Sequence, residues 1–427
     1  MESSLVLLWQ QVKRMMVMAA TRSGWKLVSR AWLLWALLQE ATGLRRAPGR
    51  VRPAPRCASP TDDEESLVSS FAAMKAKAGE LAPFGEEELA SVVRSLRNVG
   101  MSEARAAGVS GALERAAHKS HKDWAATAAF GAALAAELPV VGEAEFASIF
   151  AKVLEGGGWD GAARAAEARA ADERPWVVLV TGVNGIRKTT SIYEPFFGAA
   201  LREALVAPDG SRAGDAVADP PVGGNSFFRQ LDFVIATAAN EDFARLYGIR
   251  DVAAYSAAKD AIFSRYRTVA EAVGALLVTE AQKSGLNVMV ETSGRDVAMF
   301  DYVDHFFDDA HYRKLALNFE IADLAFAERS VDARMLGEMA RGRAAAADGD
   351  ARAVVDANAG GPYGSAVLAG VQADSRKVWA SVATGEAGDV GKSWYKAALT
   401  ITPSDDRPWT LAAAVDGAEA FDYSPRA

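Results

Sequence analysis

The chain has 427 residues, of which 50% are hydrophobic, and a formal net charge of −8. This length and composition are sufficient for one large globular domain or for two or three smaller ones. The negative charge argues against a general nucleic-acid binder, because such proteins concentrate Lys and Arg on one face. The single cysteine, Cys57, excludes an intrachain disulfide and any zinc or iron–sulfur site built from several cysteines.

Residues 1–60 differ in charge from the rest of the chain. Residues 1–58 contain ten Lys or Arg and two acidic residues, and some apolar residues fall near helical spacing. A basic, acid-poor and amphipathic start is typical of a transit peptide, so we expect a plastid or mitochondrial protein, and otherwise a cytoplasmic one. The apolar run 31–38 is too short for a bilayer, which needs about 20 residues, so we predict no membrane span. The alternative is a disordered extension.

Residues 61–171 form the second predicted segment. The composition becomes acidic at Thr61–Glu65 and then Ala-rich, with apolar residues at helical spacing. Pro83 and Gly100 mark turns between the helices. We therefore predict an all-α N-terminal domain, which could offer a surface to a protein partner. Its predicted helices cover residues 63–79, 85–98, 102–117, 121–137, 143–155 and 159–171.

Between residues 172 and 345, short apolar runs alternate with helical patterns. This alternation predicts an α/β fold with a mostly parallel sheet flanked by helices, preceded by the all-α domain. The predicted strands are 176–180, 286–290 and 315–319, and the predicted helices are 190–205, 225–247 and 258–284. Within the second helix, residues 233–237 could instead be a strand.

Residues 346–427 are predicted to be a C-terminal extension that is partly β. Candidate strands at 377–383, 395–401 and 409–415 could complete the sheet or form a small appendage. Residues 386–393 contain Gly-Lys-Ser, but a strand rather than a helix is expected after them. We therefore interpret this second Gly-Lys-Ser as a loop without a phosphate-binding role.

The first strand of the core leads into a glycine-containing turn and then into a helix. In such a turn, backbone N–H groups point inward, a lysine such as Lys188 reaches the outer phosphates, and Thr189 can hold Mg²⁺. The sequence therefore predicts a phosphate-binding loop. Its expected nucleotide-binding residues are Gly182, Asn184, Gly185, Ile186, Arg187, Lys188, Thr189 and Thr190.

Arg187 departs from the usual spacing G-x-x-x-x-G-K-[ST], because it stands where the second glycine is expected. If that position needs a positive φ angle or a close backbone approach, an arginine is strained there. Alternatively, the guanidinium lies beside the phosphates and adds positive charge.

A second motif, Glu291–Asp296, follows the second predicted strand. Ligands of parallel sheets bind at the carboxyl ends of the strands, so this motif and the glycine turn are expected to converge. Glu291 and Thr189 would then hold Mg²⁺. Arg295 could bind a phosphate through two parallel hydrogen bonds.

Three further residues complete the predicted catalytic set. Arg329 and Arg334 follow the third strand, where a helix can bring cations to a transferring phosphoryl group. Asp232 is the candidate base for an acceptor hydroxyl, with Asp215 and Asp219, which lie outside the residues described below, as alternatives. The predicted catalytic residues are thus Lys188, Asp232, Arg295, Arg329 and Arg334.

These motifs, over residues 174–345, resemble the zeta-toxin group of P-loop kinases. The resemblance implies a P-loop NTPase-like fold, ATP and Mg²⁺ as cofactors, and phosphorylation of a small molecule, with nucleotide sugars as the known acceptor class. It places Lys188 and Thr189 at ATP and Mg²⁺, Glu291, Thr292 and Arg295 in the strand-end motif, and Arg329 or Arg334 in the lid.

Two rival interpretations remain open. Gly182–Thr190 and Glu291–Arg295 also resemble the first and third nucleotide motifs of the signal-recognition-particle GTPases, although no [NT]-K-x-D guanine motif is found. Alternatively, Arg187 marks a degenerate loop, and the chain is an interaction scaffold that presents its helical domain.

Overall fold

The computed structural model describes residues 62–116, 123–138, 143–214, 227–403, 410–414 and 421–423. The predicted leader, residues 1–60, lies outside this part of the chain. No helix within the described ranges is both long and apolar enough to cross a membrane.

The N-terminal segment is helical, as predicted. The predicted helix over 143–155 is divided at Phe150, whose φ of −107° and ψ of 28° end one helix and precede the next. The observed helices are α3 (Asp62–Gly79), α4 (Glu86–Asn98), α5 (Glu103–Ala116), α6 (Trp124–Leu134), α7 (Ala144–Ile149), α8 (Ala151–Gly157) and α9 (Trp159–Glu167).

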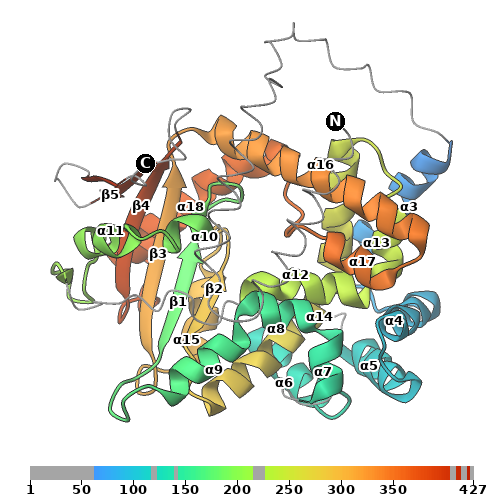
Figure 1. The fold of residues 1–427 in the computed structure, drawn as a ribbon, viewed down its shortest axis with the longest axis horizontal. Coiled ribbons are helices and arrows are strands. Elements are labelled where there is room, and N and C mark those ends of the chain that lie inside the picture. Colours follow the sequence, from blue (N-terminus) through green and yellow to red (C-terminus); the bar gives the residue numbers. More distant parts are fainter. Residues whose placement is uncertain are drawn as a thin grey trace, which may run out of the picture. The chain divides into compact units, whose positions relative to one another are not determined.

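The sheet has the strand order β2-β1-β3-β4-β5-β6 (Figure 1). The first four of these strands are parallel, whereas β5 and β6 are antiparallel, so the predicted α/β fold with a mostly parallel sheet is confirmed. The strands are β1 (Trp176–Thr181), β2 (Val288–Glu291), β3 (Arg313–Ile321), β4 (Tyr395–Thr402), β5 (Thr410–Ala414) and β6 (Phe421–Tyr423).

Three helices were predicted in the core, and two of them are interrupted in the structure. The predicted helix 190–205 is broken around Pro195, because proline disfavours a helical conformation at the residue before it. The predicted helix 225–247 is divided at Ala239, and residues 233–237 are helical. The observed helices are α10 (Lys188–Ile192), α11 (Phe197–Ala204), α12 (Phe227–Ala238), α13 (Asn240–Leu246), α14 (Val252–Lys283), α15 (Ala298–Phe306), α16 (Leu324–Asp348), α17 (Ala351–Ala357) and α18 (Leu368–Thr384).

The predicted strand at 377–383 is wrong, because these residues lie in α18. The buried residues Leu368, Val371 and Ser375 recur at helical spacing on α18, and this period outweighs the local preference of its valines for strands. The strands near 395–401 and 409–415 are confirmed, and they extend the main sheet instead of forming an appendage. The second Gly-Lys-Ser lies in the turns between α18 and β4, where Asp304 accepts a hydrogen bond of 3.2 Å from the Gly391 N–H.

Each face of the sheet has its own hydrophobic core. Val178 and Val180 of β1 belong to a cluster with α10, α11 and the first turns of α16. Val177 and Leu179 belong to a larger cluster that continues through α12 and α14 into the N-terminal helices. Alternate residues of a strand face opposite sides of the sheet. All six residues of β1 are buried because both faces of the sheet are covered.

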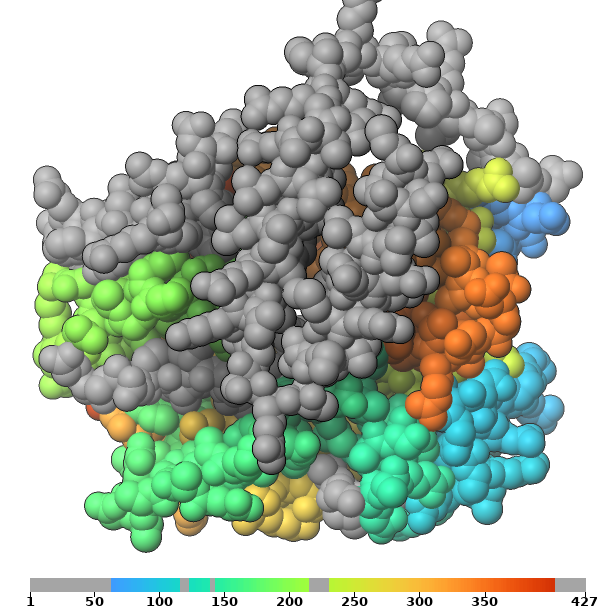
Figure 2. Space-filling model, in the orientation of Figure 1, coloured from blue at the N-terminus to red at the C-terminus, as the bar shows by residue number. Residues whose placement is uncertain are grey.

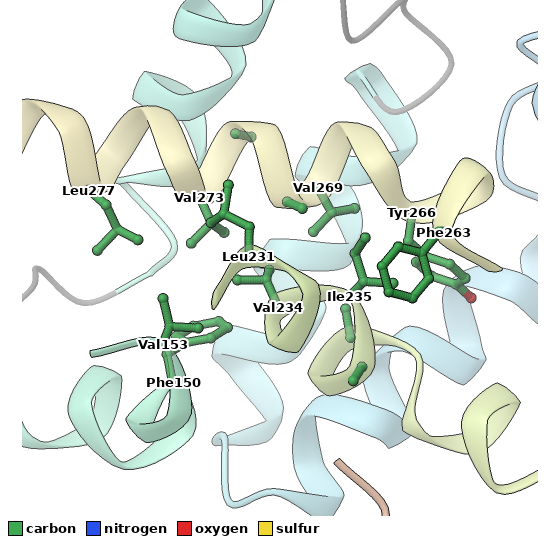
Figure 3. Packing of buried hydrophobic residues seen from close by; sticks show 14 of the residues in the cluster. Phe150, Val153, Leu231, Val234, Ile235, Phe263, Tyr266, Val269, Val273 and Leu277 are labelled. Atoms are coloured by element: carbon green, nitrogen blue, oxygen red, sulfur yellow. The ribbon is translucent and has the colours of Figure 1, made fainter. Parts of the chain in front are cut away.

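Helix α12 lies at the centre of the larger core. Figure 3 shows its Leu231 and Val234 between α14 and the side chains of Phe150, which precedes α8, and Val153 of α8, while its Ile235 lies toward Phe263 and Tyr266 of α14. The N-terminal helices therefore share a continuous core with the helices that cover the sheet.

The C-terminal half of the chain also contacts the N-terminal helices directly. In the space-filling view, the orange surface near α17 adjoins the cyan surface of α4 and α5 (Figure 2). Arg352 of α17 donates a hydrogen bond of 2.5 Å to the Val99 carbonyl and another of 3.0 Å to the Ser148 carbonyl.

Candidate functional site

The turn after β1 needs glycine at two positions. Gly182 has φ +126°, and a Cβ there would lie 2.3 Å from the Phe319 carbonyl oxygen of β3. Gly185 has φ +82°, and a Cβ there would lie 2.8 Å from the Ala327 carbonyl oxygen of α16. Both the backbone conformation and the close approach of neighbouring elements therefore exclude a side chain.

Arg187 also has a left-handed backbone, with φ +67° and ψ +26°, immediately before α10. The positive φ angle that the spacing suggested is therefore present, although the residue carries a Cβ. Its exposed guanidinium lies 5.3 Å from the centroid of the Phe326 ring and lines the cavity described below. The expected positive φ angle is thus present, whereas a position of the guanidinium beside phosphates stays a prediction.

Lys188 begins α10 and points back into the turn. Its side chain is 6% exposed, and Nζ donates hydrogen bonds of 2.7 Å to the Gly182 carbonyl and 3.0 Å to the Val183 carbonyl. Burial lowers the pKa of the Lys188 ammonium. The Glu291 carboxylate, 4.0 Å away, opposes this pKa shift, and the positive charge of Arg334 adds to it.

Thr189 and Glu291 meet across two strands. Parallel pairing of β1 and β2 aligns Val180 with Glu291, so the end of β2 lies beside the glycine turn. Thr189 Oγ1 donates a hydrogen bond of 2.9 Å to Glu291 Oε1. A hydroxyl and a carboxylate are oxygen ligands of the kind that Mg²⁺ prefers.

The motif after β2 is fastened to the end of β1. The Thr292 N–H donates to the Val180 carbonyl at 2.9 Å, and the Gly182 N–H donates to the Ser293 carbonyl at 3.3 Å. Arg295 extends from this loop, and its guanidinium lies 4.9 Å from the centroid of the Tyr363 ring. The two motifs that the sequence placed at neighbouring strand ends are therefore held together by backbone hydrogen bonds.

Asp232 lies on α12 and Arg334 lies on α16. Burial raises the pKa of the Asp232 carboxyl, although the nearby Arg267, Lys259 and Arg334 oppose this shift. Burial lowers the pKa of Arg334, whose Nε atom is buried without a hydrogen-bond partner in the described part of the chain. Both groups border the same cavity.

That cavity has a volume of about 1180 Å³. Its walls include every predicted nucleotide-binding residue except Gly182, whose carbonyl accepts from Lys188, and all but one of the predicted catalytic residues. The exception is Arg329, whose side chain is 69% exposed and lies 3.8 Å from Asp323 at the start of α16. Arg334, one and a half turns later, is the arginine of this helix that borders the cavity.

The loop between α17 and α18 forms a further wall of the cavity, and its residues were not predicted to belong to the site. Gly360 has φ +115°, and a Cβ there would lie 3.4 Å from Arg334 Nη1 and 4.0 Å from Asp232 Oδ2. A Cβ on Gly361 would lie 3.5 Å from Asn184 Nδ2 and 3.7 Å from Asp232 Oδ2. The paired glycines were the available signal, because adjacent glycines often mark a close backbone approach.

The fold and the site together define an α/β protein with four parallel strands, in which the turn after β1 and the start of α10 border a large cavity with a mixed polar and apolar lining. No protein-family model matches the chain, and no curated protein or solved structure is significantly similar to it. The chemistry of the cavity is therefore the basis for assigning a function.

Proposed function

We propose that the protein is an ATP-dependent phosphotransferase of the zeta-toxin type that acts on a small hydroxyl-bearing molecule. The observation that supports this best is that two chemically distinct sets of residues line one cavity, and in this proposal they serve as its donor half and its acceptor half. One half has Lys188, Thr189 and Glu291, and the other has Asp232 and Arg334. Phosphoryl transfer needs a phosphate cradle, a metal-organising carboxylate, a cation and an acceptor base.

The residues of the first half fit a nucleotide phosphate and Mg²⁺. The space left by Gly182 and Gly185 permits a close backbone approach, and Lys188 already binds two carbonyl oxygens, whose place a phosphate oxygen can take. Thr189 and Glu291 would supply two protein oxygens to Mg²⁺. When bound, MgATP would supply the phosphoryl group that is transferred.

The second half fits a hydroxyl acceptor. Asp232 lies on the cavity wall, where its carboxylate can accept the proton of an acceptor hydroxyl. The Arg334 guanidinium, with a buried Nε still able to donate, can bind the negative charge that develops between donor and acceptor. A base must be deprotonated to act, so activity is expected to fall when the pH is lowered. Because burial raises the pKa of Asp232, this loss should begin at a higher pH than it would for an exposed aspartate.

The first test compares nucleotides by thermal shift in the presence of Mg²⁺. We expect ATP to raise the unfolding temperature and GTP to have a smaller effect. A shift with GTP alone would instead support a GTPase. ADP release, measured with and without candidate acceptors that include nucleotide sugars, then tests phosphoryl transfer.

Lys188→Ala is expected to weaken MgATP binding about tenfold to a hundredfold, because it removes a charged hydrogen-bond donor. The chain offers a matched control in Lys392→Ala, since Lys392 occupies the second Gly-Lys-Ser and its side chain is 75% exposed. Calorimetric titration with MgATP measures both variants. Equal affinities for the two variants would contradict a phosphate-binding role for Lys188.

Arg187 supports a second candidate, an interaction scaffold with a degenerate nucleotide loop. An arginine stands on a left-handed backbone where the motif has a glycine, and this is a departure from the expected pattern. This candidate predicts no thermal shift with ATP or GTP in the wild-type chain, and recovery of binding in Arg187→Gly.

A further inference from the structure

The wall formed by the α17–α18 loop is held in place by a buried ion pair. Lys259 Nζ of α14 lies 2.7 Å from Glu338 Oε1 and 2.9 Å from Glu338 Oε2 of α16, and each side chain is 1% exposed. Both members also bind the loop. Lys259 Nζ donates to the Gly360 carbonyl at 2.7 Å, and the Ala359 N–H donates to Glu338 Oε2 at 2.9 Å.

The same loop is tied to the helix that carries the candidate base. Asn358 Nδ2 donates a hydrogen bond of 3.2 Å to the Asp232 carbonyl oxygen. Glu338 lies one turn after Arg334 on α16, and its charge opposes the lowering of the Arg334 pKa. One pair of buried charges is thus connected to the loop, to the arginine and, through Asn358, to Asp232.

Stability alone is a weak reason for this arrangement. Removing two charges from water is costly, and an apolar pair of similar volume often gives equal or greater stability. A hydrophobic pair would nevertheless leave the Ala359 N–H and the Gly360 carbonyl without these partners. The charged pair can therefore fix the position of the loop backbone, which an apolar pair cannot do.

We propose that Lys259 and Glu338 are positioning residues that hold Ala359–Gly361 between Asn184, Asp232 and Arg334, and so set the space available to the acceptor. The identity of that ligand depends on the function proposed above. The placement of the loop does not, and it can be measured separately.

The decisive variant is Lys259→Met combined with Glu338→Leu, which removes both charges at similar volume. Hydrogen exchange of the backbone amides at 359–361 is expected to become at least about tenfold faster, because two hydrogen bonds to charged groups are lost. Peptides from β1 and β3 report global opening and are expected to keep their wild-type rates. Unchanged exchange at 359–361 would overturn the proposal.

Tyr255→Phe is the matched control within the same network. The Tyr255 hydroxyl donates to Glu338 Oε1 at 2.6 Å and not to the loop backbone. Loop exchange in this variant is expected to stay within about twofold of wild type, because both loop anchors remain. Acceleration equal to that of the double variant would mean that the loop responds to any loss in the network, which contradicts a specific positioning role.

Gly361→Ala tests whether the space beside the loop belongs to the acceptor, and it can be used if the double variant does not fold. It keeps the ion pair and adds a methyl group 3.5 Å from Asn184 Nδ2 and 3.7 Å from Asp232 Oδ2. Loop exchange should remain as in wild type, while the acceptor KM rises about tenfold and the ATP KM rises clearly less, as expected for filled acceptor space that borders Asn184. A parallel rise of both KM values would contradict the assignment of this space to the acceptor.

Kinetics also separate this proposal from the proposed function. In the double variant, the acceptor KM is expected to rise about tenfold with little change in the ATP KM. If the wild-type chain transfers no phosphoryl group to any acceptor, the kinase assignment fails, and the exchange rates at 359–361 still decide the positioning role.

Discussion

At the scale of single residues, Arg187 combines a left-handed backbone with a long side chain. A residue with a Cβ is destabilised in this region by about 1–2 kcal/mol. Arg187→Gly removes that strain, whereas Arg187→Ala keeps the Cβ and removes only the guanidinium. We expect the glycine variant to be more stable than the alanine variant by about 1 kcal/mol, as measured by urea unfolding. Equal stabilities would show that the turn relaxes around the side chain.

Asp232 is expected to reduce stability at neutral pH. Burial raises the pKa of its carboxyl in the folded state, so the folded protein holds the proton more tightly than the unfolded chain does. The stabilisation from this carboxyl is therefore present at low pH and is lost as the pH rises through the folded-state pKa. Asp232→Asn should be more stable than wild type at pH 7, with a smaller difference at acidic pH, and should lose phosphoryl transfer. Denaturant unfolding over a pH series measures this, and a pH-independent difference would contradict it.

The residues of the site were predicted with unequal success, because some follow strand ends and others lie along a helix. Lys188, Thr189 and Glu291 follow apolar strands, and parallel strands bring their ends to one edge, so their convergence was predictable. Arg329 and Arg334 share a helix, and the sequence could not tell which faces the cavity. That depends on the rotation of α16 against β3 and α14, which is decided by packing.

At the scale of elements, the glycine turn depends on its contacts with β3 and α16. Gly182→Ala would place a Cβ 2.3 Å from the Phe319 carbonyl, on a backbone with φ +126°. We expect a loss of about 2–4 kcal/mol, because strain and overpacking act together. Gly198→Ala in α11 is the control, since a Cβ there meets nothing within 4 Å. It should raise the free energy of unfolding by about 0.5–1 kcal/mol. Urea unfolding of both variants measures the difference, and a neutral Gly182→Ala would refute the tight turn.

The elements themselves were largely predictable where one periodicity dominated. The all-apolar run of β1 and the long helical pattern of α14 gave the correct element type. The strand predicted at 377–383 failed because Val378, Ala380 and Val382 alternate over a short window, whereas the burial pattern of α18 extends over 17 residues. The break at Pro195 shows that the residue before a proline can end a helix even within a favourable pattern.

At the scale of the whole molecule, the N-terminal helices and the sheet share apolar and ionic contacts. Phe71, Phe146 and Phe263 belong to one hydrophobic cluster, and the Arg265 guanidinium of α14 donates to Glu88 of α4 at 3.0 Å. Residues 61–171 were predicted to be a separate domain because periodicity identifies the apolar face of a helix but not the element that packs against it.

We therefore expect residues 62–403 to unfold in one transition, and a fragment that begins at residue 172 to lack cooperative unfolding. That fragment would expose the apolar faces of α12 and α14 that α3, α6 and α8 cover. Calorimetry and circular dichroism of the full chain and of the fragment measure this. Two separate transitions in the full chain would instead establish independent domains.

The central position of β1 also affects the order of events during synthesis. This strand hydrogen-bonds to β2 and β3, whose residues follow it by more than a hundred positions, and the first helices are covered by α14, which ends at Lys283. A chain emerging from the ribosome therefore carries its N-terminal apolar surfaces uncovered until most of the polypeptide has been made. Long-range pairing of this kind slows folding. Assembly of the glycine turn must accordingly follow translation of β3, and we expect the nascent chain to be prone to aggregation until then.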